Sequence, residues 1–355
     1  MLDERPLAFL KRLLDAPGPS GFEQAPARLW REEAKAFATL DVDVGGNSIA
    51  TVNPKGAPRV MLAGHVDEIG LMIVHVDDDG FLSFAPIGGW DSQVLVGQRV
   101  IVEGGTGPVV GVIGKKAIHM IKREDRDKVS KITDLWIDIG ATNKAEALGR
   151  VRVGDAGVIA TPLQELPNGR LVSRSIDNRI GAFVVLEALR RLAADPPTAC
   201  VVAVATTQEE ISHTGGGART SAFRLEPDVA VVVDVTHATD WPGAEKKEQG
   251  DFKLGGGPVL SRGSAVSRVV FDQLIAAAEA EKIPYAIEAA PRATSTDADA
   301  IYTARRGIAT GLVSVPCRYM HSPNEMVALE DLDRAAALLA AWVRRLEPAT
   351  SFVPA

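Results

Sequence analysis

Residues 59–68 read Arg-Val-Met-Leu-Ala-Gly-His-Val-Asp-Glu, an apolar run that leads directly into His65, Asp67 and Glu68. Short apolar runs without alternation are typical of strands buried on both faces, as in parallel sheets covered by helices. In open sheets of this kind, ligands bind beyond the carboxyl ends of the strands. We therefore predict a strand at Arg59–Ala63 and a functional site just after it.

Three further apolar runs lead into polar residues in a similar way. They are Ala199–Thr206 before Glu209 and Glu210, Val229–Val233 before Asp234, and Gly311–Val315 before His321. Because the carboxyl ends of parallel strands meet at one edge of a sheet, these side chains are expected to converge. Asp177 joins them if the start of its predicted helix faces the same edge.

Segments with helical spacing alternate with these strands. The expected helices are 6–15, 23–38, Asp177–Leu192, Ala218–Phe223, Ser267–Glu281, Asp297–Arg305 and Leu329–Leu346. Additional strands are expected at Asp41–Val44, Ile49–Asn53 and Tyr285–Ala289. This alternation predicts an α/β fold in which helices flank a sheet.

The region from about 69 to 165 has a different pattern. Its strand-like pieces, separated by glycines, are Gly70–Val76, Gly80–Ala85, Gly97–Val102, Pro108–Gly114, Asp134–Ile139 and Gly157–Thr161. Helical spacing is nearly absent apart from Lys144–Leu148, which is typical of a small all-β unit. The simplest architecture is an α/β domain at 1–68 plus 166–355, with a β domain inserted at 69–165.

Composition restricts the class of protein. The chain has 355 residues, of which 46% are hydrophobic, and a net charge of −7 that makes a nucleic-acid-binding surface unexpected. The amino end is charged from its third residue, and no apolar run approaches the roughly 20 residues that span a bilayer. Cys200 and Cys317 fit two buried reduced thiols. We expect a soluble, cytoplasmic protein with no membrane or nucleic-acid partner.

The residues expected at the sheet edge are imidazoles and carboxylates, which suit Zn(II), Co(II) or Mn(II). Each has a plain structural explanation by itself, since an Asp before a helix is usually a cap and a Glu pair after a strand is often a solvated turn. Together they favour a metal or acid–base site. Two histidines and three carboxylates suit two ions that share a carboxylate. Glu209 and Glu210 can supply one ligand and one free base.

The remaining histidines are weaker candidates. His75 lies in a strand of the insert, His119 in a charged loop, and His237 shortly after Asp234. His213 lies beside Gly215–Gly217 in the loop after the Glu pair, where we favour substrate contact or a structural role.

Seven stretches, in order along nearly the whole chain, carry a resemblance to a known family. They are Gly-His-Val-Asp-Glu-Ile-Gly (64–70), Ile-Gly-Gly-Trp-Asp-Ser-Gln-Val-Leu (87–95), Ile-Asp-Ile-Gly-Ala-Thr (137–142), Ser-Arg-Ser-Ile-Asp-Asn-Arg-Ile-Gly (173–181), Thr-Thr-Gln-Glu-Glu (206–210), Asp-Val-Thr-His-Ala (234–238) and His-Ser-Pro-Asn-Glu (321–325). They resemble the tetrahedral (TET) aminopeptidases of metallopeptidase family forty-two, which includes glutamyl and deblocking aminopeptidases and members once described as endoglucanases.

The resemblance implies a role for each residue. The implied metal ligands are His65 and Asp234 at one ion, Glu210 and His321 at the other, and Asp177 bridging both, with Zn(II) or Co(II) as the expected ions. Glu209 would be the general base that takes a proton from water and returns it to the leaving amine. Asp67 would hydrogen-bond His65 and fix its ring.

The resemblance also implies an architecture and partners. The α/β domain would be a zinc-peptidase-like mixed sheet flanked by helices, and the insert a small PDZ-like β-barrel that helps to build dimers and a hollow tetrahedral dodecamer. Substrates would be short peptides. After the Glu pair this chain has Ile-Ser-His-Thr-Gly-Gly-Gly-Ala where many members have a shorter segment, so the side-chain preference is not carried over.

Three alternatives remain open at this point. A glycosidase could use a carboxylate pair from Glu209, Glu210 and Asp234, although five Trp and three Tyr offer no obvious row of sugar-stacking rings. A deacylase of N-acylated amino acids could use the same metals. A non-catalytic peptide-binding shell would have no need for a spare base at Glu209.

Overall fold

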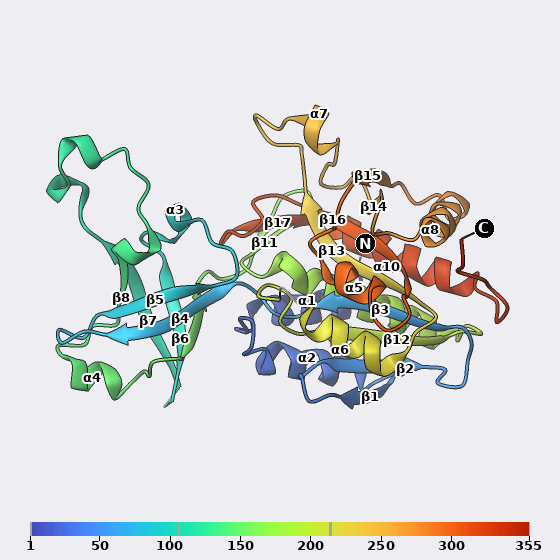
Figure 1. Cartoon of the computed structure of the whole chain (residues 1–355), viewed down its shortest axis with the longest axis horizontal. Coiled ribbons are helices and arrows are strands. Elements are labelled where there is room, and N and C mark those ends of the chain that lie inside the picture. The colour runs from blue at the N-terminus through green and yellow to red at the C-terminus, as the bar shows by residue number, and fades with distance from the viewer. Residues whose placement is uncertain (1, 106, 213–214, 355) are drawn as a thin grey trace.

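The computed structural model describes residues 2–105, 107–212 and 215–354. These residues form an α/β body and a smaller barrel of strands that extends from one side of it (Figure 1). The chain leaves the body after strand β3 (Arg59–His65), forms the barrel, and returns to the body before helix α5 (Ile176–Ala194).

The body is built on an eight-stranded sheet with the order β1-β2-β12-β3-β13-β16-β14-β15. The bounds of its other strands are β1 Thr39–Val42, β2 Ser48–Val52, β12 Cys200–Thr206, β13 Val229–His237, β14 Val259–Gly263, β15 Ala286–Ala290 and β16 Ala309–Cys317. The four central strands, β12, β3, β13 and β16, are parallel, whereas β1, β2 and β14 introduce antiparallel pairs. The sheet is therefore mixed, and its parallel centre brings four carboxyl ends to one edge.

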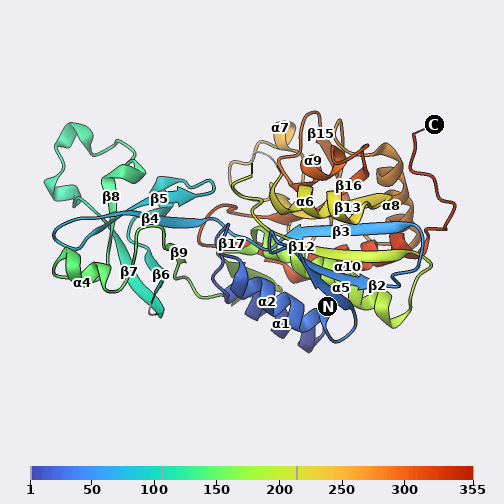
Figure 2. The same ribbon diagram turned by 60° about the horizontal axis from the view of Figure 1, so that its bottom comes forward.

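Helices cover both faces of this sheet (Figure 2). Val60 and Leu62 of β3 pack into one buried cluster, and Met61 and Ala63 into another, because successive side chains of a strand point to opposite faces. The helices of the first cluster are α1 (Glu4–Asp15), α2 (Gln24–Ala34), α5, α8 (Arg268–Ala280) and α10 (Leu329–Arg344), and those of the second are α6 (Gly216–Leu225) and α9 (Asp297–Tyr302). The predicted α/β fold with a flanked mixed sheet is confirmed.

Local sequence explains where the helices begin and which face they bury. In α1, Pro6 lies in the first turn, where a missing N–H costs nothing, and Phe9, Leu10, Leu13 and Leu14 form one buried stripe. In α8, the Ser267 hydroxyl caps the helix by accepting a hydrogen bond from the N–H of its third residue.

A small three-stranded sheet links the barrel to the site region. It consists of β10 (Gln164–Leu166), β11 (Arg170–Ser173) and β17 (Glu325–Ala328), paired antiparallel in that order. Strand β11 leads directly into α5, and Ser173 pairs with Glu325 of β17. This pairing brings the start of α5 next to the segment that contains His321.

The insert forms a closed barrel with the order β4-β5-β8-β7-β6-β9. The bounds are β4 Gly70–Val76, β5 Leu82–Ile87, β6 Arg99–Gly104, β7 Gly107–Lys115, β8 Leu135–Asp138 and β9 Ala156–Ile159, with the short helices α3 (Ser92–Leu95) and α4 (Lys144–Leu148) and three 3₁₀ turns at Ile118–Met120, Arg123–Asp125 and Ile132–Asp134. Its strands enclose a separate apolar core. The predicted small β-barrel is thus confirmed, while the boundaries 1–68, 69–165 and 166–355 stay a prediction.

The predicted elements differ from the observed ones at several points. Strand β13 continues to His237, so Asp234 lies within the strand and not after its end. The short strands β10, β11, β14 and β17 and the one-turn helix α7 (Lys246–Gln249) were not predicted. Strand β14, which ends in Arg262 and Gly263, lacks the long apolar run that identifies the central parallel strands.

Cys200 and Cys317 are free and buried, as predicted. Within the described ranges, no helix is long and apolar enough to cross a membrane. A cytoplasmic location stays a prediction.

Candidate metal centre

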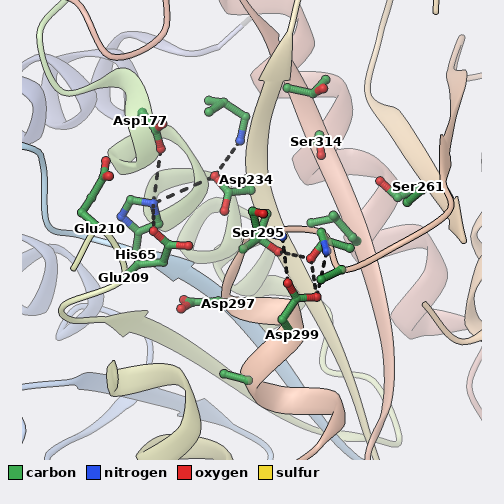
Figure 3. Close-up of a pocket in the computed structure, with 18 of the residues that line it drawn as sticks. His65, Asp177, Glu209, Glu210, Asp234, Ser261, Ser295, Asp297, Asp299 and Ser314 are labelled. Carbon is green, nitrogen blue, oxygen red and sulfur yellow. Dashed lines mark hydrogen bonds and ion pairs between the residues drawn. The ribbon is translucent and has the colours of Figure 1, made fainter. Parts of the chain in front are cut away.

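The predicted site residues meet at the carboxyl edge of the parallel strands (Figure 3). His65 is the last residue of β3, Asp234 lies in the adjacent β13, and Asp177 lies in the first turn of α5. Figure 3 shows Asp177, Glu209 and Asp234 directed at the His65 ring, with Glu210 beside them. Segments that are far apart in the sequence therefore form one cluster.

Asp177 lies between the two histidines. Its Oδ1 is 3.3 Å from His65 Nε2, and its Oδ2 is 3.4 Å from His321 Nε2. The backbone of α5 departs from helical angles at Asp177 and Asn178, which directs this carboxylate into the site. Each oxygen of one carboxylate thus faces a different imidazole, as a carboxylate shared between two metal ions would.

Three more carboxylates complete the cluster. Glu209 Oε2 lies 3.7 Å and Asp234 Oδ1 4.0 Å from His65 Nε2, and Glu210 Oε2 lies 3.4 Å from His321 Nε2. Two groups of three residues have ligand atoms that all lie within 4.8 Å of one another within the group. One triad is His65, Asp177 and Glu210, and the other is His65, Glu209 and Asp234. Either triad could hold a divalent metal ion, but both include His65, so they are alternative ligand sets.

The carboxylates at this site repel one another in a place that water hardly reaches. Burial raises the pKa of Glu209 to about 9. The charge of His65 opposes this increase, and the nearby charges of Asp234 and Asp297 add to it. Burial and the charge of Asp177 raise the pKa of Glu210 well above its ordinary value, and burial does the same for Asp234. Such a cluster is stable in its charged form only when cations neutralise it.

Unlike Glu209, Glu210 and Asp234, the two histidines and Asp177 have pKa shifts that favour their charged forms. Burial disfavours the charge on Asp177, but hydrogen bonds from His321 and His65 outweigh it and hold the pKa of Asp177 below its ordinary value. Burial lowers the pKa of His65, but the charge of Asp67, together with hydrogen bonds to Asp177 and Asp67, outweighs this and raises it well above the ordinary range. Strong shifts of this kind concentrate at functional sites.

Asp67 has a wider role than the predicted contact with His65. It is fully buried, and its Oδ1 lies 3.3 Å from His65 Nδ1. Its carboxylate also accepts hydrogen bonds from the backbone N–H groups of Glu209 and Glu210, each at 3.2 Å, and from the Ser20 hydroxyl. One side chain therefore fixes the first histidine and the glutamate loop together.

Glu325, the last residue of the stretch at 321–325, supports the backbone of the site, a role that the sequence did not reveal. Its Oε2 accepts the backbone N–H of Asp177 at 3.0 Å, and its Oε1 accepts that of His321 at 2.8 Å. His321 has a positive φ of 58°, a conformation that costs energy for a residue other than glycine. The buried Glu325 carboxylate holds this backbone in place. Its position four residues after His321 was the only signal available.

A buried ion network supports the end of β3. Glu68 Oε1 lies 2.8 Å from Arg179 Nη2, and Glu68 Oε2 lies 3.0 Å from Arg174 Nε. Arg179 is fully buried and also donates to the carbonyls of Val66 and Leu13 at 3.0 and 3.1 Å. The network ties β3 and α5, which supply His65 and Asp177, to the end of α1.

A cavity of about 1030 Å³ opens onto these residues. Its wall includes His237, Glu288 and Asp297, and the Asp297 carboxylate accepts a hydrogen bond from Thr206. Asp297 is a further buried acid that the sequence did not single out. His75 and His119 lie in β4 and a 3₁₀ turn of the barrel, and His213 lies outside the described residues.

Known proteins share the sequence pattern behind this geometry. The model of the M42 glutamyl aminopeptidase family matches residues 46–338. This chain belongs to the M42 glutamyl aminopeptidase family. It is a peptide hydrolase, and the predicted kinship with the TET aminopeptidases is confirmed.

Three relatives illustrate the membership. The lysyl aminopeptidase of Pyrococcus furiosus is 34% identical over 96% of this chain and 97% of its own. The structure of a TET aminopeptidase from a marine sediment archaeon of the Thaumarchaeota matches with a TM-score of 0.92 and 34% identity, covering 97% of each chain. The TET1 peptidase of Pyrococcus horikoshii, which can assemble into a tetrahedron or a large octahedral shell, matches with a TM-score of 0.86 and 32% identity over 96% of this chain and 100% of its own.

Proposed function

We propose that this M42 family member is a dinuclear metal-dependent aminopeptidase that releases N-terminal residues from short peptides. The proposed ligands are His65 and Asp234 at one ion, Glu210 and His321 at the other, and Asp177 between them. The observation that carries this proposal is the placement of Asp177, whose two oxygens face Nε2 of His65 and Nε2 of His321 at 3.3 and 3.4 Å.

The residues present fit two divalent cations. Among the residues that the structure describes, buried Oε1 of Glu210 has no hydrogen-bond partner, so a cation would satisfy an atom that is otherwise costly to bury. The ligand set consists of imidazole nitrogens and carboxylate oxygens, which suits Zn(II) or Co(II). No thiolate is available as a ligand within the described residues, because the two free cysteines are buried in β12 and at the end of β16 and belong to neither triad.

Glu209 is the proposed general base. Both glutamates line the cavity, but the side chain of Glu209 is 17% exposed and that of Glu210 is 5% exposed, so Glu209 is the more accessible to water. Two bound cations would lower the pKa of water and polarise the scissile carbonyl. The Glu209 carboxylate would accept the proton from that water and return it to the leaving amine. Asp67, through the N–H of Glu209, holds the base in position.

The cavity and the barrel suggest the substrate and the assembly. A space of about 1030 Å³ beside the proposed metals accommodates the end of a peptide. Because the TET1 peptidase of Pyrococcus horikoshii can assemble into a tetrahedron or a large octahedral shell, we propose that the barrel at 69–165 helps this chain to form a homo-oligomer, with a tetrahedral dodecamer as the expected form. Membership in an aminopeptidase family favours this function over the glycosidase and deacylase alternatives.

The proposal is tested by hydrolysis of aminoacyl-p-nitroanilides. Metal-stripped protein is assayed before and after addition of Zn(II), Co(II) or Mn(II), with Glu209→Gln as the matched variant. We expect activity only with metal, and a loss of at least about 100-fold in kcat in the variant, the size expected for a general base. Activity that persists in excess chelator, or full activity of Glu209→Gln, would contradict the proposal.

A further inference from the structure

The barrel reaches one of the two histidines at the metal centre. After β5, the loop Gly88-Gly89-Trp90 leaves the barrel and passes beside His321. The carbonyl oxygen of Gly89 lies 2.9 Å from Nδ1 of His321. These residues belong to a stretch, Ile-Gly-Gly-Trp-Asp-Ser, that has no part in the proposed chemistry.

This contact determines which nitrogen of His321 can bind a metal. A carbonyl oxygen only accepts hydrogen bonds, so Nδ1 of His321 must carry the hydrogen. In the neutral ring, Nε2 then has the free lone pair. That Nε2 lies 3.4 Å from both Asp177 Oδ2 and Glu210 Oε2. The Gly89 carbonyl therefore selects the tautomer and the ring orientation that point a donor atom into the site.

The loop that carries Gly89 is held tightly. The indole N–H of Trp90 donates to the carbonyl of Gly70, the first residue of β4, at 2.9 Å. A Cβ on Gly89 would lie 3.2 Å from Nδ1 of His321, and one on Gly88, whose φ is +75°, would lie 2.6 Å from Ile69. The Trp90 anchor and the two glycines together allow the backbone to approach the imidazole.

The other histidine is oriented differently. Nδ1 of His65 faces Asp67, which belongs to the α/β body and which Ser20 holds from the opposite side. His65 is 1% exposed, whereas the side chain of His321 is 36% exposed and lies against the barrel loop. The ring of His65 is thus oriented by a contact within the body, whereas the ring of His321 is oriented by a contact with the barrel loop.

We propose that Gly89 and Trp90 are positioning residues through which the inserted barrel orients His321, so that the metal ion on the His321 side binds tightly only when the barrel is docked. This inference rests on the proposed metal role of His321. It makes the two proposed metal sites unequal, because the site at His65 lacks this dependence. Loss of a contact that orients a ligating histidine lowers metal affinity by about 10–100-fold.

The test compares two variants with matched controls. Gly89→Ala crowds the His321 ring, and Trp90→Phe keeps an aromatic ring but removes the anchoring N–H. The control Gly149→Ala lies at the end of α4 with a φ of −69°, and the control Trp136→Phe lies in β8 of the barrel. Each metal-free full-length protein is titrated with Co(II), and binding is followed by visible absorption and by the metal content after gel filtration.

Wild type and controls are expected to bind two Co(II) per chain. In Gly89→Ala and Trp90→Phe, one ion should bind as in wild type and the second should bind about 10–100-fold more weakly. Two unchanged affinities, or an equal weakening of both sites, would overturn the inference. A wild-type chain that binds no Co(II) would instead contradict the proposed function itself. Circular dichroism of each variant identifies any that fail to fold. If Gly89→Ala fails to fold, Trp90→Phe provides the decisive result.

Discussion

The buried ion network beneath the site provides the sharpest stability prediction. Glu68 is 1% exposed and faces two cations, Arg179 at 2.8 Å and Arg174 at 3.0 Å, while also accepting the N–H of Gly18 at 3.1 Å. Glu68→Gln keeps the shape but removes the charge, which leaves two buried guanidinium groups uncompensated. Breaking a buried pair in this way costs about 3–5 kcal/mol.

The assay is urea unfolding of metal-free protein, followed by circular dichroism and by tryptophan fluorescence. We expect the free energy of unfolding to fall by about 3–5 kcal/mol in Glu68→Gln. The control is Glu32→Gln, because Glu32 and Arg28 form an exposed i,i+4 pair whose atoms are 3.8 Å apart, and such pairs contribute about 0.3–0.5 kcal/mol. A loss below about 1 kcal/mol in Glu68→Gln would refute the assignment of this network as a structural anchor.

Three other predictions concern a buried acid, the positioning of the glutamate loop and the metals. Burial raises the pKa of Asp331 from 3.8 to about 6, so its stabilising contribution is complete below pH 3.8 and is lost as the pH rises through 6. The unfolding free energy of Asp331→Asn relative to wild type should therefore rise by about 2 kcal/mol between pH 4 and 7, and a flat difference in urea unfolding would contradict this. Asp67→Ala frees His65 and the glutamate loop, so Co(II) affinity should fall about 10–100-fold in a calorimetric titration, and an unchanged affinity would refute the positioning role. Chelation removes ions that stabilise the folded chain, so the melting temperature should fall with excess chelator and recover with Zn(II), and no shift would argue against bound metal.

The sequence correctly predicted that His and carboxylate side chains meet at one edge of the sheet, and the reason is physical. Val60–Ala63 and Val201–Ala205 are continuous apolar runs because they are buried on both faces, and such runs identify central parallel strands. Parallel strands must end at a common edge, so the His and carboxylates near those ends had to converge. The barrel was also predictable, since its strands are separated by glycines at turns such as Gly80.

The supporting contacts could not be predicted in the same way. Asp67 binds the N–H groups of Glu209 and Glu210, and Glu325 binds that of Asp177, across separations of 142, 143 and 148 residues. Side-chain periodicity carries no signal for such contacts. They depend on the final packing of loops. The same holds for the Gly89 carbonyl, because a backbone oxygen is present at every residue and only the fold brings this one to His321.

The central claim is that two metal ions bind on either side of Asp177. The most direct test is anomalous diffraction at the zinc absorption edge from crystals grown with Zn(II). The account predicts two peaks per chain, separated by about 3.5–4 Å, one beside His65 and Asp234 and one beside His321 and Glu210. A single peak, or two peaks that Asp177 does not bridge, would contradict it.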